Sequence, residues 1–593
     1  MLNHPDIAPR VEALLARMSL DQKIGQMTQT ERMAITPAEV KTFHIGSVLS
    51  GGGSAPGDNL PTDWVNMNDA YWAASMEADE NHLAIPIIYG VDAVHGNNNV
   101  LGATVFPHNI GLGAANDPDL IERIARVTAE EILATGVEWT FAPTLAVAQD
   151  HHWGRTYESY SENPALVASY AARFVQGLQG NLGDDSVVAC VKHWVGDGGT
   201  THGIDQGETT LIWDQLESTH MTPYYPALQA GVMTVMVSFN SWNGDKCHGS
   251  HYLLTEVLKH QLDFNGYIIS DWDGIDYLSE SYCEAIAMSV NAGIDMFMVS
   301  ENWRSFIDHL RWHVERGNVA MARIDDAVRR ILSVKFAYGL FEKPRPLDRP
   351  WSNDPGFGGA VHREVACEAV RKSLVLLKNE SRLLPLQPQA RILVAGKNAH
   401  NRGHQCGGFT VAWQGATDNE TIIGGSSIWE GIEAIASQAT LDIDGTGADS
   451  AAHDVGIVVI GETPYAEGMG DIRDGDDVII QAGSQIKGLL KVLEPYGSSL
   501  TLNQLHPEDL QTITNISDQG IPVVVVLITG RPLLIDSEMD AATAFVAAWL
   551  PGSEGQGIAQ VLFGEHDFTG KLSFTWPAQE DSTLFPLGYG LTY

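Results

Sequence analysis

Seven short apolar segments recur along the first half of the chain, and each closes in polar or glycine-rich residues. They are residues 45–49, 85–89, 139–147, 187–191, 232–239, 267–270 and 294–299. Helix-like segments lie between several of them, at residues 118–135, 164–179, 214–230 and 250–261. Strands that alternate with helices and are followed by polar residues are typical of a parallel α/β fold. Seven such units over about 300 residues fit a (β/α)8 TIM-type barrel with one irregular unit, and a doubly wound open sheet is the alternative.

A proline- and glycine-rich segment at residues 341–359 divides the chain. It holds four prolines and three glycines, a composition typical of an extended linker. Apolar runs and helix-like segments then alternate again, with runs at residues 391–395, 441–443, 456–460, 523–528 and 544–549. We therefore predict a barrel domain at residues 1–340, a linker at 341–360, and an α/β sandwich domain with a terminal tail at 361–593.

Length and composition describe a globular protein with more than one domain. A chain of 593 residues exceeds what one hydrophobic core supports, and 44% hydrophobic with 18% charged residues is ordinary for such proteins. The chain has no run of about 18 apolar residues, so we expect no membrane span. The net charge of −39 argues against nucleic acid as a partner, because its phosphates would be repelled. A neutral polysaccharide is compatible with this charge.

The cysteines and the first residues bear on cofactors and location. Five cysteines are widely spaced and form no C-x-x-C pair, so neither a disulfide framework nor a zinc site is indicated, and buried free thiols are expected. The first ten residues lack the basic region and apolar core of a signal peptide. We expect a cytoplasmic protein from the chain as written, or a periplasmic or secreted one if a leader was removed.

Residues 266–276, Gly-Tyr-Ile-Ile-Ser-Asp-Trp-Asp-Gly-Ile-Asp, are the most informative stretch. The apolar run 267–270 predicts a buried strand that ends in Asp271 and Trp272. The C-terminal ends of strands are where α/β folds place their chemistry. The carboxylate can act as nucleophile or base, and the indole offers a flat apolar face, so the pair suits a sugar. An aspartate that caps the next helix beside a core tryptophan is the alternative.

The ends of the other apolar segments carry further charged side chains and tryptophans. They are Asp92, His95, Trp153, Arg155, Glu158, Lys192, His193, Trp194, Asp197 and Trp242. In a barrel all of them would point to one rim, where hydroxyl-binding charges beside aromatic faces form a sugar pocket. Taken singly, each has a structural explanation, since a lone histidine is often a satisfied internal residue and Arg155 with Glu158 can be a surface ion pair.

Eight motifs follow one another along nearly the whole chain. They are GVDAVHG at 90–96, FPHNIGLG at 106–113, WGRTYESY at 153–160, KHWVGDG at 192–198, IISDWDG at 268–274, KSLVLLKN at 372–379, LPGSEGQG at 550–557 and LGYGLTY at 587–593. The ordered set resembles glycoside hydrolase family 3, specifically its two-domain β-D-glucan exohydrolases and β-glucosidases. The resemblance implies a (β/α)8 barrel followed by an α/β sandwich. It also implies retaining, exo-acting hydrolysis of β-glucosides that needs neither a metal nor an organic cofactor.

The resemblance assigns two catalytic carboxyl groups. Asp271 matches the nucleophile that forms a covalent glycosyl-enzyme, and retention requires a second carboxyl group about 5–5.5 Å away. The family takes this acid/base from the second domain, on a loop that matches residues 461–471. Two glutamates lie on this loop. Glu462 directly follows a predicted strand, and Glu467 lies further along. The family pattern favours Glu467, and so does the longer reach of a residue out on the loop.

Substrate binding is also implied by the resemblance. Residues that match the cage around the terminal sugar are Asp92, Arg155, Lys192 and His193. A carboxylate there can accept hydroxyl protons, and the cations can donate to hydroxyl oxygens. Trp272 and Trp413 match an aromatic pair that clamps the next sugar, which implies tolerance of several β-linkages because stacking reads ring faces.

Three positions depart from the pattern of the plant enzymes. Phe239, which we include among the substrate-binding candidates, stands where a tyrosine is usual. Tyr277 replaces an arginine and Gln206 replaces a glutamate. The missing tyrosine hydroxyl removes a partner for the nucleophile, and the missing arginine changes the outer subsite. We therefore expect activity to survive and linkage preference to differ.

Competing functions are tested by the same residues. β-N-Acetylglucosaminidases of this family use an Asp-His pair on the loop after the Lys-His motif, whereas residues 192–205 hold His202 but no Asp-Ser-His. A β-xylosidase differs by one hydroxymethyl group in the pocket, and Asp92 favours a hexose. A non-catalytic carbohydrate-binding protein would lose a carboxylate, yet Asp271 and Glu467 are both present. No dinucleotide or phosphate-binding motif follows a strand. The expected partner is a β-glucan or gluco-oligosaccharide.

Overall fold

The first half of the protein is an eight-stranded parallel barrel. The computed structural model describes residues 5–474, 494–579 and 582–593. In chain order the barrel strands are β1 (Thr28–Glu31), β2 (Ser47–Ser50), β3 (Ile88–Val91), β4 (Trp139–Thr140), β5 (Val188–Trp194), β7 (Thr234–Val237), β10 (Tyr267–Ile269) and β11 (Phe297–Met298). Backbone bonds of 3.0 Å from Met296 N–H to Ile268 O and from Ser270 N–H to Met296 O close the ring. The predicted barrel is confirmed.

The strand that the apolar pattern does not reveal is β1. Its sequence, Thr-Gln-Thr-Glu, is polar, and yet all four residues are buried. Gln29 donates from Nε2 to Ser47 Oγ at 2.8 Å, and Thr30 donates from Oγ1 to Ser300 O at 2.9 Å. Hydrogen bonds inside the barrel therefore offset part of the cost of burying these polar side chains.

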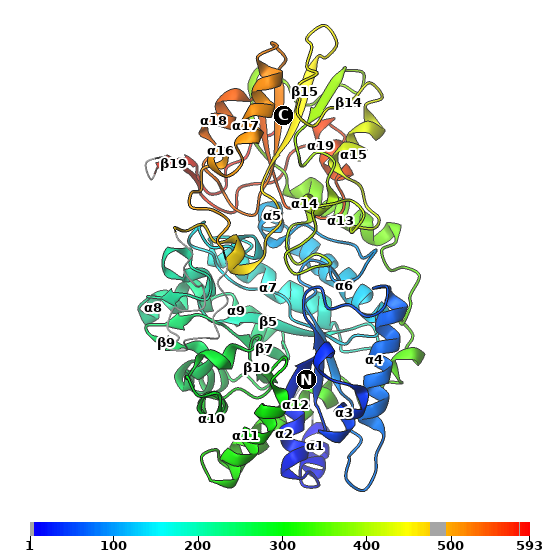
Figure 1. The fold of residues 1–593 in the computed structure, drawn as a ribbon, viewed down its shortest axis with the longest axis vertical. Helices are drawn as coiled ribbons and strands as arrows, with labels where there is room; N and C mark the ends of the chain where they lie inside the picture. The colour runs from blue at the N-terminus through cyan, green and yellow to red at the C-terminus, as the bar shows by residue number, and fades with distance from the viewer. Residues whose placement is uncertain (1–4, 475–493, 580–581) are drawn as a thin grey trace.

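Helices surround the barrel (Figure 1). They include α1 (Ile7–Leu15), α2 (Leu20–Gln26), α3 (Pro37–Thr42), α4 (Pro61–Met76), α6 (Pro118–Ala134), α7 (Pro164–Gln179), α10 (Tyr282–Ala292), α11 (Trp303–Glu315) and α12 (Met321–Ala337). The predicted helices at 118–135 and 164–179 are confirmed as α6 and α7, and each begins with a proline. The residue before each proline, Asp117 for α6 and Asn163 for α7, caps the helix by accepting a backbone N–H with its side chain. The predicted helix at 214–230 divides into α8 (Trp213–Gln215), the π-helical η5 (Leu216–Met221) and α9 (Tyr224–Gln229). The segment predicted at 250–261 forms a π-helix, η7 (Tyr252–Gln261).

The second half is built on a six-stranded mixed sheet. Its order is β12 (Val375–Asn379), β17 (Ala544–Trp549), β16 (Val523–Ile528), β15 (Val455–Gly461), β13 (Ile392–Ala395) and β14 (Thr440–Leu441). β12 pairs antiparallel with β17, and the other pairs are parallel. Helices on the sheet include α13 (Ala360–Ser373), α15 (Ile428–Ile435), α17 (Pro507–Ser517) and α19 (Gln556–Leu562). The second α/β fold is confirmed, and β12 is a strand that the sequence analysis did not predict.

The two halves share a core at their junction. Figure 1 shows the second sheet, whose strands run from yellow-green to orange-red, stacked on one end of the barrel with α5 (Asn109–Ala115) between them. Ile110 and Ala114 of α5, with Trp153 and Tyr157 of the barrel, pack into the hydrophobic cluster of the second sheet. Loops from both halves therefore meet across a packed interface.

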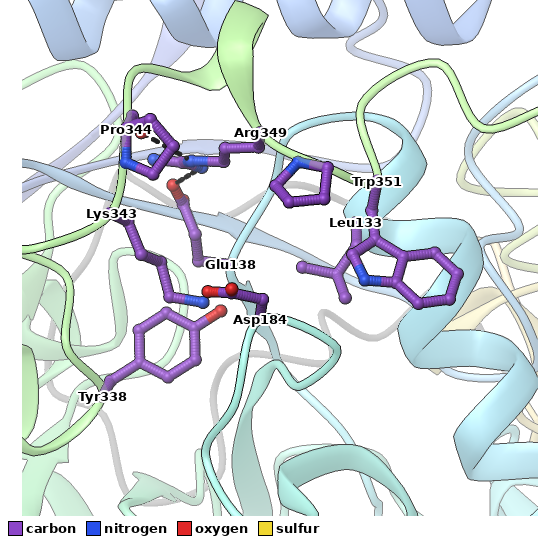
Figure 2. Close-up of a pocket in the computed structure, with 9 residues that line it drawn as sticks. Leu133, Glu138, Asp184, Tyr338, Lys343, Pro344, Arg349 and Trp351 are labelled. Atoms are coloured by element: carbon purple, nitrogen blue, oxygen red, sulfur yellow. Dashed lines mark hydrogen bonds and ion pairs between the residues drawn. The ribbon is translucent and has the colours of Figure 1, made fainter.

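Residues between α12 and α13 follow the barrel surface. Arg349 donates from Nη1 to Gly136 O at 2.9 Å and forms a buried ion pair with Glu138. Figure 2 shows the small pocket beneath this segment, with Arg349 and Glu138 joined by a dashed line and Tyr338 and Trp351 also on its wall. The segment is thus fixed to the barrel, and the domain limits at 340 and 361 stay a prediction.

Candidate active site

The carboxyl ends of the barrel strands carry the predicted side chains. Asp92 follows β3, and Asp271 comes two residues after β10. Lys192 and His193 are among the last three residues of β5. Arg155 lies on the long connection between β4 and α7. Because all barrel strands are parallel, these ends share one rim, which is the rim that faces the second sheet.

Two buried cations are paired with carboxylates on this rim. Lys192 Nζ lies 2.7 Å from Asp92 Oδ1, and Arg155 binds Glu158 through Nε and Nη2 at 2.7 and 2.9 Å. Burial alone would lower the pKa of Lys192, but the carboxylates of Asp92 and Glu158 outweigh it and raise the pKa. Both cations therefore stay charged and present donors to a ligand. Glu158 is a partner in this cage, not the surface acid of the alternative interpretation.

His193 connects the cage to Asp271. Its Nδ1 lies 2.7 Å from Asp197 Oδ2, and its Nε2 lies 3.3 Å from Arg155 Nη2 and 3.7 Å from Asp271 Oδ2. Burial holds the pKa of His193 well below its ordinary value, and the neighbouring Arg155 adds to the shift. The ring is therefore neutral, with Nδ1–H donating to Asp197 and Nε2 accepting from Arg155.

Asp271 is held by its backbone and by burial. Its N–H donates to His248 Nε2 at 3.0 Å, and its Oδ1 accepts the N–H of Trp272 at 2.6 Å. Burial raises the pKa of Asp271 to about 6, while Arg155 and Lys192 oppose the shift. The carboxyl group is thus mostly ionised at neutral pH, a state in which it can act as a nucleophile.

The second domain supplies Glu467 to the same rim. It opens the short helix η11 (Glu467–Gly470) on the loop after β15, and its Oε1 lies 3.8 Å from Arg155 Nη1. Burial raises the pKa of Glu467 to about 8; Arg155 opposes the shift, and the charges of Asp205 and Asp271 add to it. Glu467 is thus mostly protonated at neutral pH, although its side chain keeps 27% of its surface exposed.

Glu462, the other glutamate of this loop, is enclosed in the second domain. Its carboxylate accepts hydrogen bonds from Arg531 Nε at 3.1 Å, from the N–H of Gly530 at 2.8 Å and from the hydroxyl groups of Thr529 and Tyr465 at 3.0 Å. Only 1% of the residue is exposed. These bonds occupy the carboxylate, so the structure brings Glu467 rather than Glu462 to the barrel rim.

A glycine turn after β2 lies against both predicted stacking tryptophans. A Cβ atom on Gly51 would lie 2.8 Å from Cζ3 of Trp272, and one on Gly52 would lie 2.9 Å from the Cα of Trp413. Trp272 is 38% exposed, and Trp413 is half-buried. The turn therefore brings the indole of Trp272 and the backbone of Trp413 close together, although the two residues come from different halves of the chain.

Phe239 and the histidines complete the surroundings. The centroid of the Phe239 ring lies 5.6 Å from that of His248 and 6.0 Å from that of Tyr277, so it stands beside the imidazole that accepts the N–H of Asp271. His95 does not join the cage: it stacks on His108 at 3.7 Å, and its Nε2 bonds to Phe409 O at the domain junction. That finding corrects the expectation that His95 shares the sugar pocket.

Sequence reasoning missed His248, which holds the turn that carries Asp271. A Cβ on Gly274 would lie 2.5 Å from His248 Nε2, so the imidazole fits only against a glycine. Burial lowers the pKa of His248 to about 3, and Lys246 adds to the shift, so Nε2 stays an acceptor. Its sequence context, Lys-Cys-His-Gly, ends no apolar run and gave no signal. Among the described residues, no group of three or more metal-ligating side chains could hold a metal ion.

The fold and the rim together define a two-domain enzyme that cleaves glycosidic bonds. The family model for the glycosyl hydrolase family 3 N-terminal domain matches residues 19–334, and the model for the C-terminal domain of that family matches residues 374–593. The chain therefore belongs to glycoside hydrolase family 3. No helix among the described residues is long and apolar enough to span a membrane.

Similar proteins include two glucosidases and a glucanase. A lysosomal beta glucosidase of Dictyostelium discoideum is 32% identical over 98% of this chain and 76% of its own. A periplasmic beta-glucosidase of Salmonella typhimurium is 30% identical over 100% of this chain and 81% of its own. The crystal structure of an exo-1,3/1,4-beta-glucanase from a Pseudoalteromonas species superposes with a TM-score of 0.93 at 43% identity, covering 100% of this chain and 74% of that one.

Proposed function

We propose that the protein is a retaining, exo-acting β-glucosidase that releases glucose from the non-reducing ends of β-1,3- and β-1,4-linked glucans and gluco-oligosaccharides. The observation that carries the proposal is the pair of carboxyl groups, Asp271 and Glu467, on either side of Arg155 and His193. Burial raises the pKa of Asp271 to about 6 and that of Glu467 to about 8, so the two values lie apart. Such a separation fits one ionised nucleophile and one protonated acid at neutral pH.

The reaction follows from these protonation states. Asp271 attacks the anomeric carbon while Glu467 gives its proton to the leaving glycosidic oxygen, so the bond to the aglycone breaks as the Asp271 ester forms. Glu467, now a carboxylate, takes a proton from a water molecule that attacks the anomeric carbon from the β face, and the bond from that carbon to Asp271 breaks. Two inversions at one carbon return the β-anomer, and both carboxyl groups end in their starting states.

The cage accounts for exo-action. Asp92 can accept hydroxyl protons of the terminal sugar, and Lys192 and Arg155 can donate to its hydroxyl oxygens. Below this layer the barrel is filled by buried side chains, so a glucan chain cannot continue past it. Substrate therefore extends only outward, toward the turn at which Trp272 and Trp413 lie.

The similar proteins support a glucan substrate. The Pseudoalteromonas relative is an exo-1,3/1,4-beta-glucanase and the curated relatives at 30–32% identity are β-glucosidases. A second candidate, a β-xylosidase, is favoured by a relative of that name from Formosa agariphila at 27% identity over 99% of this chain. The lower identity makes it the alternative.

Product analysis tests the proposal. We expect laminaribiose, cellobiose and laminarin to give glucose as the only early product, with the β-anomer appearing first in proton NMR spectra. Nitrophenyl β-glucoside should exceed nitrophenyl β-xyloside in kcat/KM, because one hydroxymethyl group in a fitted pocket is worth about 10- to 200-fold. An initial α-anomer would exclude retention. Oligosaccharides among the early products of laminarin would exclude exo-action. A higher kcat/KM for the nitrophenyl xyloside or N-acetylglucosaminide would show that the substrate is not a glucoside.

A substitution in the outer subsite separates sugar stacking from chemistry. We expect Trp272→Ala to lower kcat/KM for laminaribiose about fivefold, because one aromatic stacking contact is worth about 1 kcal/mol. Methyl β-glucoside, which places no ring there, should lose less than about threefold. Trp312→Ala, on an indole of similar exposure (41%) on α11, is the control. Equal losses with both substrates would show that Trp272 does not contact the second sugar.

A further inference from the structure

One buried carboxylate joins the loop of Glu467 to the barrel. Asp471 is fully buried; its Oδ1 accepts the N–H of Gly154 at 2.9 Å, and its Oδ2 accepts the N–H of Asp205 at 3.0 Å. Gly154 immediately precedes Arg155, the cation that faces Glu467. A single side chain from the second domain thus bridges two barrel loops at the edge of the site.

Further hydrogen bonds, one between backbone groups and two from the side chain of Arg531, extend this contact. Ile472 N–H donates to His152 O at 2.9 Å, and Arg531 donates to Gly470 O at 2.5 Å and to His151 O at 3.1 Å. Residues 151–154 of the barrel therefore lie along residues 470–472 of the second domain. Among these residues, Asp471 is the one whose side chain bonds to two separate barrel segments. It therefore fixes the spacing of those segments and the distance of the Glu467 loop from the barrel.

The contact is too close for any side chain on Gly154. A Cβ atom there would lie 2.1 Å from the carbonyl oxygen of Glu467 and 2.7 Å from the carbonyl carbon of Gly470. Glu467 itself has φ 54°, a left-handed conformation uncommon outside glycine. Such a backbone persists when its surroundings determine it, and here those surroundings include the barrel loop at Gly154 and the side chain of Gln414, which bonds to both backbone groups of Ala466.

We propose that Asp471 is the positioning residue for Glu467: its two hydrogen bonds to the barrel set the distance between the acid/base of one domain and the nucleophile of the other. The inference rests on the proposed role of Glu467. A carboxyl group that donates a proton in the transition state must be held in hydrogen-bond reach of the leaving oxygen. A misplacement of about 1 Å can cost about 100-fold in rate.

The leaving group distinguishes this role from a structural one. Asp471→Asn keeps the size of the side chain but directs an amide NH2 at a backbone N–H, so one of the two bonds is lost. Protonation by Glu467 matters for a sugar leaving group and hardly at all for dinitrophenolate. We expect kcat/KM to fall about 100-fold for laminaribiose and less than about threefold for dinitrophenyl β-glucoside. A series of aryl β-glucosides should show a steeper dependence on the pKa of the leaving phenol.

A matched control exists in the barrel. Glu131 is a buried carboxylate that also bridges two backbone N–H groups, those of Thr104 at 2.9 Å and Gly358 at 3.0 Å. Its position away from the rim residues makes Glu131→Gln a test of simple destabilisation. We expect this variant to lower Tm while leaving the dependence on the leaving group as in the wild type.

Gly154→Ala tests the same contact from the barrel side. The added methyl group must displace the carbonyl of Glu467, so we expect the same selective loss with poor leaving groups. This variant decides the matter if Asp471→Asn does not fold.

Glu467→Gln separates the inference from the function on which it rests. Suppose that Glu467→Gln loses activity mainly with poor leaving groups, while the folded Asp471 and Gly154 variants lose activity equally on all substrates or lose none. The positioning role is then wrong, and the acid/base assignment stands. If Glu467→Gln itself is insensitive to the leaving group, the acid/base assignment is wrong, and the positioning role is excluded with it.

Discussion

Asp271→Asn is expected to lower kcat/KM for every β-glucoside by about 10⁴-fold or more. The amide has nearly the shape of the carboxylate, and the backbone bond from residue 271 to His248 does not involve the side chain. The loss therefore comes from the missing nucleophile, without which the glycosyl-enzyme cannot form; removal of a catalytic nucleophile commonly has effects of this size. Initial rates with dinitrophenyl β-glucoside, together with Tm, measure it.

Trapping the intermediate gives an independent measurement. In the wild type, a dinitrophenyl 2-deoxy-2-fluoro-β-glucoside should inactivate the enzyme, and mass spectrometry should find the sugar on a peptide that contains Asp271. Asp276→Asn, on a half-buried carboxyl group five residues further along, is the control and should keep the wild-type rate within about threefold. A label on another carboxyl group, or an Asp271→Asn variant with more than about 1% of wild-type activity, would contradict the assignment.

The barrel was largely predictable because seven of its strands are apolar or end in recognisable residues. Asp92, Lys192, His193 and Asp271 lie at or just after the ends of such strands, so the rule that barrel enzymes use their strand ends placed them on one rim. The strand β1 was not predicted because its buried residues are polar side chains that form hydrogen bonds inside the barrel. Hydrophobic periodicity carries no information about such a strand.

Residues that depend on contacts between distant segments could not be found by pattern. Glu467 reaches the rim from the second domain, and only the family resemblance selected it over Glu462. His248 and Asp471 act through bonds to backbone N–H groups far away in sequence, which leave no periodic trace. His95 shows the converse: it follows a strand, yet it turns to the domain junction. Position after a strand predicts the rim but not the direction of a side chain.

Glu467→Ala should have the second large effect, and that effect should depend on the substrate. We expect kcat/KM for laminaribiose to fall about 10³-fold, because general acid catalysis contributes about 10²- to 10⁴-fold. With dinitrophenyl β-glucoside, which needs no acid, the glycosyl-enzyme should form and then persist, because the variant lacks the base that activates water. Azide needs no base, so it should raise kcat and yield β-glucosyl azide.

The pH dependence of the wild type should show both carboxyl groups. Asp271 must be ionised to attack, so kcat/KM should rise as the pH passes about 6, the value to which burial raises its pKa. Glu467 must be protonated to donate, so kcat/KM should fall as the pH passes about 8. The two groups influence each other, so the profile reports the pKa values of the pair. In Glu467→Ala the alkaline limb should disappear while the acid limb stays.

Glu462→Gln is the comparison that decides between the two glutamates of the loop. Its carboxylate is bonded to Arg531 and buried, so we expect a lower Tm from an unpaired buried arginine but an unchanged alkaline limb and no response to azide. If instead azide rescues Glu462→Gln and leaves Glu467→Ala inactive, the acid/base is Glu462. That result would require the loop to rearrange when substrate binds, since Glu462 points into the second domain here.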